Sequence, residues 1–187
     1  MLNETLSYTY TTGNKLETEI TIFPHSRKDN RKIVHTYNNQ LLETERREYA
    51  QAPSDAFDQL LSVESWEYNE RGQVVTHKNP HQLRVNNYNK DGKLKQTTGF
   101  GRDASVRHDP NPAKNDYDPQ MRETFSYTKE NQLKEQKRYD LVVGDGSEPT
   151  LTKRFGKKEL PVSILESYQR SRPPEILLTE VKYTFWD

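Results

Sequence analysis

The chain has 187 residues with equal numbers of basic and acidic side chains, so its formal net charge is zero. Nucleic-acid-binding chains usually carry a basic excess, and we therefore expect no nucleic-acid partner. The absence of Cys excludes disulfide bonds and thiolate metal sites.

The first residues, MLNETLSYTYTT, contain neither the basic nor the apolar stretch of a signal peptide. No apolar run in the sequence is long enough for a membrane-spanning helix. We expect a cytoplasmic protein without a membrane span, and a periplasmic or envelope location only if a leader has been removed.

Turns of one kind recur along the chain. In each, a Tyr is followed by Gly or Asn at the fourth residue and by Leu or Val at the sixth. The copies run from Tyr10 to Leu16 with Asn14, from Tyr68 to Val74 with Gly72, from Tyr88 to Leu94 with Gly92, and from Tyr127 to Leu133 with Asn131. Tyr37 begins a shorter version, NNQLL. Because Gly and Asn tolerate the positive φ of tight turns, each copy predicts a β-hairpin.

The residues on either side of these turns alternate between apolar and polar. Leu6, Tyr8 and Tyr10 share one parity before the first turn, and Val181–Phe185 alternates in the same way. This period of two, in segments rich in aromatic and β-branched residues, predicts half-buried antiparallel strands. Five turns imply about ten strands. We therefore predict an all-β fold with one or two short helices: an antiparallel β-meander of about ten strands that is curved or barrel-like.

Aromatic rings must supply much of the core, since 11 Tyr, 6 Phe and 2 Trp stand in a chain that is only 30% hydrophobic. We expect a thin core of Tyr and Leu beneath a heavily charged surface. The residues expected to be largely buried are Trp66, Phe125, Tyr127, Leu133 and Tyr183.

The unit YNKDGKL resembles the YD-repeat, or rearrangement-hot-spot, pattern, in which such an element marks successive hairpins of a β-meander. The resemblance covers about seven residues at each of four sites, which begin at Tyr10, Tyr68, Tyr88 and Tyr127. The spacing between these sites is irregular, unlike the regular arrays of the family. The resemblance therefore implies the hairpin element alone.

Three segments break the pattern of a single domain spanning residues 1–187, at about 50–62, 100–123 and 156–175. The first is expected to be a short helix beginning at Asp55 or a long hairpin loop. The second reads as a long loop, which in a compact domain is usually functional or disordered. In the third, Leu160, Ile164, Leu165 and Tyr168 have helical spacing and predict a short amphipathic helix that ends before two prolines.

The sequence contains no recognisable catalytic or cofactor motif. No Ser lies in a Gly-x-Ser-x-Gly elbow, and GDGSEP lacks the lysine of a phosphate loop. His77 and His81 follow a strand with a proline between them, and the acidic loop around Asp109 lacks the ligand order of a calcium site. We expect no metal, no cofactor and no enzymatic activity.

A protein partner is the remaining expectation. Arginine and tyrosine are favoured at interfaces, and loops on a rigid scaffold commonly carry recognition. The predicted partner-binding residues are Arg102, Arg107, Asp109, Tyr168, Arg170 and Arg172. We interpret the chain as a non-enzymatic protein-binding module, most specifically a bacterial immunity-type protein that neutralises a cognate toxin by occlusion. The alternatives are an envelope β-meander protein that binds lipid or polysaccharide, or an enzyme of unknown class.

Overall fold

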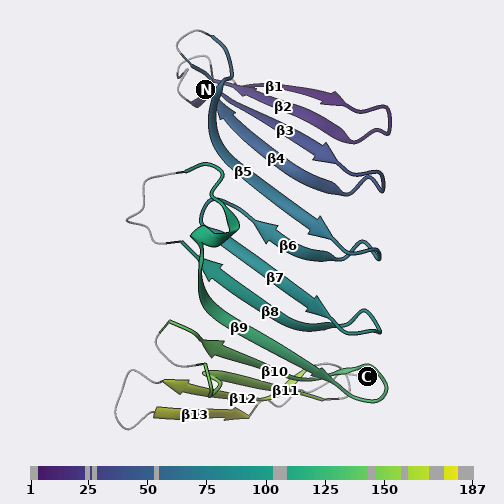
Figure 1. Ribbon diagram of the computed structural model, residues 1–187, viewed down its shortest axis with the longest axis vertical. Coiled ribbons are helices and arrows are strands. Elements are labelled where there is room, and N and C mark those ends of the chain that lie inside the picture. Colours follow the sequence, from purple (N-terminus) through teal and green to yellow (C-terminus); the bar gives the residue numbers. More distant parts are fainter. Residues whose placement is uncertain are drawn as a thin grey trace. The chain divides into compact units, whose positions relative to one another are not determined.

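The computed structural model describes residues 4–23, 26, 29–52, 55–102, 109–142, 146–156, 160–168 and 175–180 (Figure 1). Within them, thirteen strands form an antiparallel sheet in which the strand order follows the chain from β1 to β13. The strands are β1 (Thr5–Tyr10), β2 (Leu16–Ile22), β3 (Arg31–Tyr37), β4 (Glu43–Ala50), β5 (Gln59–Tyr68), β6 (Val74–Lys78), β7 (Gln82–Tyr88), β8 (Leu94–Gly101), β9 (Asp118–Tyr127), β10 (Leu133–Asp140), β11 (Leu151–Phe155), β12 (Pro161–Tyr168) and β13 (Glu175–Glu180). The predicted all-β meander is confirmed.

The strand order is linear, so the sheet does not close into a barrel. The five tyrosine turns account for β1 to β10. A sixth hairpin, β11–β12, has Phe155 in the place of the tyrosine, and Phe155 pairs with Pro161 across the turn. The repeated sequence unit does not include this hairpin, because the unit begins with a tyrosine. The two strands of this hairpin and β13 are the strands that the expected number of ten left out.

The five tyrosine turns share one backbone conformation. The fourth residue after the tyrosine has positive φ in every copy: Asn14 (57°), Leu41 (58°), Gly72 (73°), Gly92 (80°) and Asn131 (63°). The residue directly after the tyrosine closes the turn with its side chain. In the third copy, Asn69 Oδ1 accepts the N–H groups of Arg71 and Gln73, both at 3.0 Å. Asn38 and Asn89 make the same pair of bonds, while Thr11 and Thr128 use a hydroxyl.

The turn after Tyr37 is as long as the others, so the expectation of a shorter version is wrong. Leu41 occupies the left-handed position that Gly or Asn fills elsewhere, and β4 begins at Glu43, six residues after the tyrosine. The side-chain bonds of Asn38 hold the turn despite the unfavourable residue. Leucine at positive φ is strained, because its Cβ crowds the backbone there.

A second use of the turn tyrosines joins one hairpin to the next. Tyr37 donates its hydroxyl hydrogen to the carbonyl of Leu16 at 2.7 Å. Tyr68 donates to the carbonyl of Glu43 at 2.6 Å, and Tyr127 donates to that of Leu94 at 2.8 Å. Each acceptor is the first residue of the return strand in the preceding hairpin. We call these three hydrogen bonds the tyrosine ties.

Neither of the two segments considered as helices is helical in its described residues. The first agrees with its alternative, a long hairpin loop, because β4 ends at Ala50, β5 begins at Gln59, and residues 51–52 and 55–58 belong to no helix or strand. Gln59–Tyr68 is β5, which pairs with β4 and β6, and Pro161–Tyr168 is β12, which pairs with β11 and β13. Apolar residues three and four apart in a short segment fit a helix or a strand equally well. Strands on both sides stabilise the extended conformation, because they hydrogen-bond the backbone N–H and C=O groups. The local sequence does not show which strands will be its neighbours. One helical element of the described residues is a three-residue 3-10 turn, η2 (Lys114–Asp116).

The chain divides into two compact units: Met1–Leu83 with Arg102–Tyr117, and Arg84–Gly101 with Asp118–Asp187. The buried apolar residues among those described all lie in the first unit: Ala50, Val63, Pro80, Leu83, Pro112 and Tyr117. The expected core was wrong, since Trp66, Phe125, Tyr127 and Leu133 are only half-buried and Tyr183 lies outside the described residues. A sheet face without a second packed layer leaves its side chains partly in water. That the whole chain is one domain stays a prediction.

The tyrosine ties predict that Tyr68→Phe destabilises the protein by about 1 kcal/mol, because the carbonyl of Glu43 loses its hydrogen-bond donor while the ring is retained. Urea unfolding followed by circular dichroism measures the change. Tyr8→Phe is the matched control, since Tyr8 lies on the exposed strand β1. Equal losses of stability in the two variants would contradict the role given to the ties.

The strain at Leu41 predicts that Leu41→Asn stabilises the protein by about 1 kcal/mol, because Asn adopts positive φ at lower cost. The neighbouring change Leu42→Asn is the control, and it should destabilise the protein, since Leu42 lies 3.4 Å from where a Cβ on Gly72 would stand. Thermal and urea unfolding of both variants test the pair. A loss of stability in Leu41→Asn would show that its side-chain packing outweighs backbone strain.

Candidate functional site

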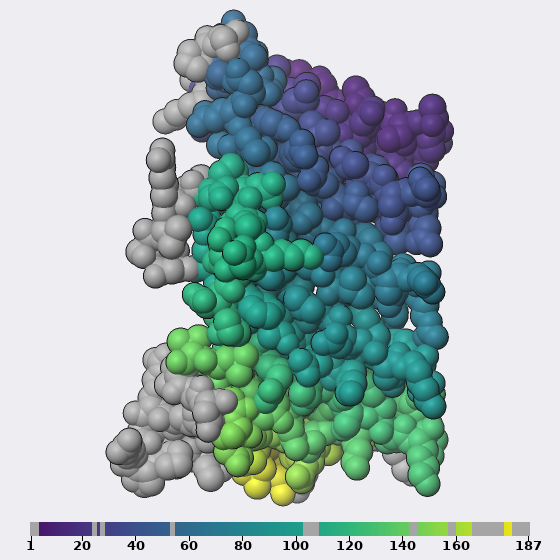
Figure 2. Space-filling model, viewed as in Figure 1, coloured from purple at the N-terminus to yellow at the C-terminus, as the bar shows by residue number. Residues whose placement is uncertain are grey.

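A strap, defined as residues 109–117, lies across β5 and β6 in the first unit. Figure 2 shows its teal-green atoms over the blue strands of that unit. The N–H of Val63 donates to the carbonyl of Pro110 at 2.8 Å. The Lys78 ammonium donates to the Asn111 side chain and to the carbonyl of Pro112, each at 2.9 Å. These bonds and the full burial of Pro112 anchor the strap to one face of the sheet.

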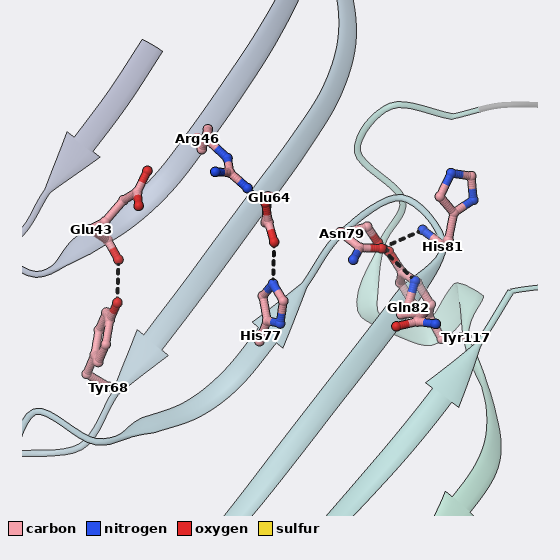
Figure 3. A network of polar contacts seen from close by, with 9 residues as sticks. All are labelled: Glu43, Arg46, Glu64, Tyr68, His77, Asn79, His81, Gln82 and Tyr117. Carbon is pink, nitrogen blue, oxygen red and sulfur yellow. Dashed lines mark hydrogen bonds and ion pairs between the residues drawn. The ribbon is translucent and has the colours of Figure 1, made fainter. Parts of the chain in front are cut away.

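The end of the strap is anchored by Tyr117. Its side chain is 5% exposed, and its hydroxyl donates to the carbonyl of Asn79 at 2.5 Å. Burial, reinforced by nearby aspartates, raises the pKa of Tyr117 above the ordinary value. Asn79 also accepts the N–H groups of His81 and Gln82 through its side chain, so the β6–β7 turn and the strap are tied at one residue (Figure 3).

The opposite face of the same strands carries a cluster that we call the Trp66 face: Arg46, Glu64, Trp66 and His77. Arg46 pairs with Glu64 across β4 and β5, and Trp66 pairs with His77 across β5 and β6. The strap instead contacts the alternate positions, through Lys78 and through Lys114 on Glu67 at 2.7 Å. Because successive side chains of a strand point to opposite faces, the strap and this cluster lie on opposite sides of the sheet.

The side chains of the Trp66 face hold one another in place. Glu64 accepts a hydrogen bond from Arg46 and lies 2.6 Å from His77 Nε2, so it bridges two strands (Figure 3). The His77 ring stacks on Trp66 with centroids 5.4 Å apart and an interplanar angle of 4°. The Arg46 guanidinium lies 5.6 Å from the centre of the Trp66 ring. Charge and ring contacts thus fix four side chains from three strands.

The Glu64 carboxylate is kept ionised by its partners. Burial is the largest influence and raises its pKa, but the hydrogen bonds from His77 and Arg46, with their charges, outweigh it. The pKa of Glu64 therefore lies below its ordinary value. A second histidine makes a similar pair, since His35 Nδ1 lies 2.6 Å from the Glu43 carboxylate and His35 is opposite Arg46 in the sheet.

Across the described part of the chain, no three His, Asp or Glu side chains gather into a group that could hold a metal ion. In the same residues, no helix has the length and apolar character needed to span a membrane.

The structure places only some of the partner-binding residues predicted from the sequence. It brings Arg102 and Asp109 together, because the Arg102 guanidinium donates to the Asp109 carbonyl at 3.4 Å where the strap begins. Tyr168 is the last residue of β12. Arg107, Arg170 and Arg172 lie outside the described residues. The segment expected at 100–123 is shorter than predicted, since β8 ends at Gly101 and β9 begins at Asp118.

The Trp66 face was not found by sequence reasoning. Glu64 is one of 28 acidic residues, and the sequence suggests for His77 only a metal site shared with His81. In the structure His77 contacts Glu64, whereas His81 belongs to the following turn (Figure 3). A usable signal existed: Glu64 and Trp66 stand two residues apart before a tyrosine turn, and His77 follows that turn. Folding the hairpin about the turn puts these side chains on one face.

No protein-family model and no curated protein matches this chain. Two solved structures, "Crystal Structure of TcdB2-TccC3-TEV" and "Crystal Structure of TcdB2-TccC3", align with a TM-score of 0.50, at 11% and 12% identity over 95% and 94% of this chain. The chain spans 12% of the length of each. A DUF3836 family protein from Parabacteroides distasonis aligns at a TM-score of 0.32 and 11% identity, over 53% of this chain and 89% of that one. At such identities the likeness to the YD-repeat-containing TcdB2-TccC3 shows the fold alone, and it fits the weak YD-repeat resemblance.

The lowered pKa of Glu64 predicts a pH-dependent contribution to stability. A carboxyl whose pKa is lower in the folded state stabilises the fold above its unfolded pKa, and this contribution is lost as the pH falls through the folded pKa. Glu64→Gln should therefore cost about 1 kcal/mol at neutral pH and less as the pH falls below the ordinary value of 4.5. Urea unfolding at several pH values measures this, with the exposed Glu130→Gln as control. A cost independent of pH would contradict the assignment.

Proposed function

We propose that this chain is a non-enzymatic protein-binding module whose Trp66 face contacts a protein partner. The observation that carries the proposal is the difference between the two faces of β5 and β6. The strap covers one of them, while on the other the side chains of Arg46 and His77 remain 43% and 31% exposed. Trp and Arg are enriched among the residues that dominate protein interfaces.

The order within the Trp66 face supports binding over a general solvent-facing role. Arg46 and Trp66 are held by Glu64 and His77 before any partner arrives. A side chain that is already fixed loses less rotational freedom on binding, so more of its contact energy appears as affinity. Solvated surface charges need no such arrangement, because water accommodates any rotamer.

The finer proposal is an immunity-type protein that neutralises a cognate toxin by covering it. It is supported by the absence of Cys, the lack of a catalytic motif and a composition that is 30% charged. A stable protein interface needs roughly 800 Å² from each partner, which a few adjacent strands supply. The likeness to TcdB2-TccC3 concerns the fold and leaves the toxin proposal to experiment. Such a protein would act in the cytoplasm.

The test begins with affinity purification of the partner from the source organism and continues with binding measurements on the purified pair. Arg46→Ala and Trp66→Ala should each weaken binding by roughly tenfold or more, while Lys114→Ala on the strap should change it less than twofold. Circular dichroism and urea unfolding establish that the variants remain folded. Equal affinities for all three variants would place the interface elsewhere.

The same assay tests the residues predicted from the sequence. Arg107→Ala and Arg170→Ala should weaken binding if irregular segments contribute to the interface, as loops on rigid scaffolds often do. For the immunity proposal, co-expression of the chain should restore growth to cells that produce the partner. Copurification of a lipid or polysaccharide in place of a protein would favour the envelope alternative over the binding module.

A further inference from the structure

A pocket lies between the first two tyrosine turns, in the first unit of the chain. The β1–β2 and β3–β4 turns are at the same end of the sheet (Figure 1). The pocket has a volume of about 440 Å³, and we call it the turn pocket. Its lining includes Thr11, Gly13, Glu17, His35 and Tyr37. Ligand sites commonly have volumes of about 300–1,000 Å³, so the turn pocket has room for one long side chain.

Gly13 leaves space in the turn pocket that a side chain would fill. It is the third residue after the tyrosine of its turn. The other four copies carry a polar side chain at that position: Gln40, Arg71, Asp91 and Glu130. A Cβ at Gly13 would stand 3.6 Å from Leu41 Cδ2 and 3.8 Å from Thr11 Oγ1, and both of these residues line the pocket. A longer side chain at this position would therefore reduce the pocket.

The turn pocket offers hydrogen-bond acceptors that have no donor. Glu17 is the only Asp, Glu, Lys or Arg among the described residues that line it, and no hydrogen bond or ion pair joins Glu17 to another described residue. His35 Nδ1 lies 2.6 Å from the Glu43 carboxylate, which only accepts, so Nδ1 carries a hydrogen. In the neutral ring Nε2 is then an acceptor, and it is buried without a hydrogen-bond partner. Such an atom costs free energy until a donor reaches it.

The charged lining of the turn pocket is on the same side of the sheet as the Trp66 face. Extending the β2–β3 register places Glu17 opposite His35, and His35 is opposite Arg46 in the β3–β4 pairing. Arg46 is in turn opposite Glu64, so these four residues form one row across β2 to β5. Side chains directly opposite each other in antiparallel strands share a face. A partner that contacts the Trp66 face can therefore reach the turn pocket without crossing the sheet.

We propose that the turn pocket receives an arginine side chain of the protein partner, an inference that rests on the proposed function of the Trp66 face. A guanidinium always carries a positive charge and has donors only. Glu17 supplies the opposite charge, and His35 Nε2 supplies a further acceptor once side chains adjust, as they commonly do at interfaces. Tyr37 contributes a ring that its tie to Leu16 holds in place, and arginine stacks on such rings.

The test uses the full chain alone, with N-acetyl-arginine methylamide as the probe and the ring signals of the five His followed by NMR. His35→Gln identifies the His35 signal by its loss. The probe should shift that signal in a saturable way, and the uncharged citrulline derivative should bind roughly tenfold more weakly. Glu17→Gln should weaken probe binding by a similar factor, as should Gly13→Gln, which fills the pocket. Glu19→Gln is the matched control, because Glu19 is on the same strand and face but outside the lining.

Three results with the probe would overturn the inference: no saturable shift of the His35 signal, equal binding of the two derivatives, or equal losses in Glu17→Gln and Glu19→Gln. Binding to the purified partner separates this inference from the proposed function. If Trp66→Ala weakens partner binding while Glu17→Gln and Gly13→Gln leave it unchanged, the Trp66 face stands and the arginine proposal falls. A loss in Glu17→Gln and Gly13→Gln without one in Trp66→Ala would support the pocket and contradict the Trp66 face.

Discussion

The hydrogen bond from a turn tyrosine to a carbonyl of the preceding hairpin is the interaction on which the sheet depends. Each hairpin can form from local residues alone, but a lone two-stranded hairpin is only marginally stable in water. The ties from Tyr37, Tyr68 and Tyr127 attach three of the hairpins, β3–β4, β5–β6 and β9–β10, each to the one before it at the turn end. Burial of the Tyr37 and Tyr68 rings, with the nearby Glu43 charge, raises the pKa of both hydroxyls, so they remain donors.

The ties matter because few side chains of the described sheet are deeply buried. Most of its side chains are half-buried, and the few deeply buried apolar residues include Val63 on β5 and Pro112 and Tyr117 in the strap. On the face opposite the strap, the same strands and β4 rely on cross-strand pairs such as Arg46 with Glu64 and Trp66 with His77. The strap also makes the two faces of the sheet different. The strap covers one face of β5 and β6, and the other face keeps an ordered group of side chains in contact with water.

Local turn chemistry made the hairpins predictable. Positive φ at Gly72 and Gly92 follows from residue type, and the spacing of tyrosine and aliphatic residues places the strands on either side. The pattern failed where the structure uses other residue types. Leu41 occupies the turn position that the pattern assigns to Gly or Asn, and Phe155 occupies the position that it assigns to Tyr. The helix expected over Leu160–Tyr168 failed for another reason. A short apolar segment carries no period long enough to separate a helix from a strand, and the neighbouring strands decide.

By itself the sequence determined an all-β antiparallel meander, the positions of its main turns and the absence of thiol chemistry, because each follows from neighbouring residues or from composition. Only the tertiary structure decided the site. Arg46, Glu64 and His77 come from three strands, and their meeting depends on register, which shifts every side chain to the other face if it slips by one residue. The strap covers one of the two faces through contacts between residues more than thirty positions apart, such as Lys78 and Pro112. No local pattern encodes such a contact, since it exists only after the strands have paired.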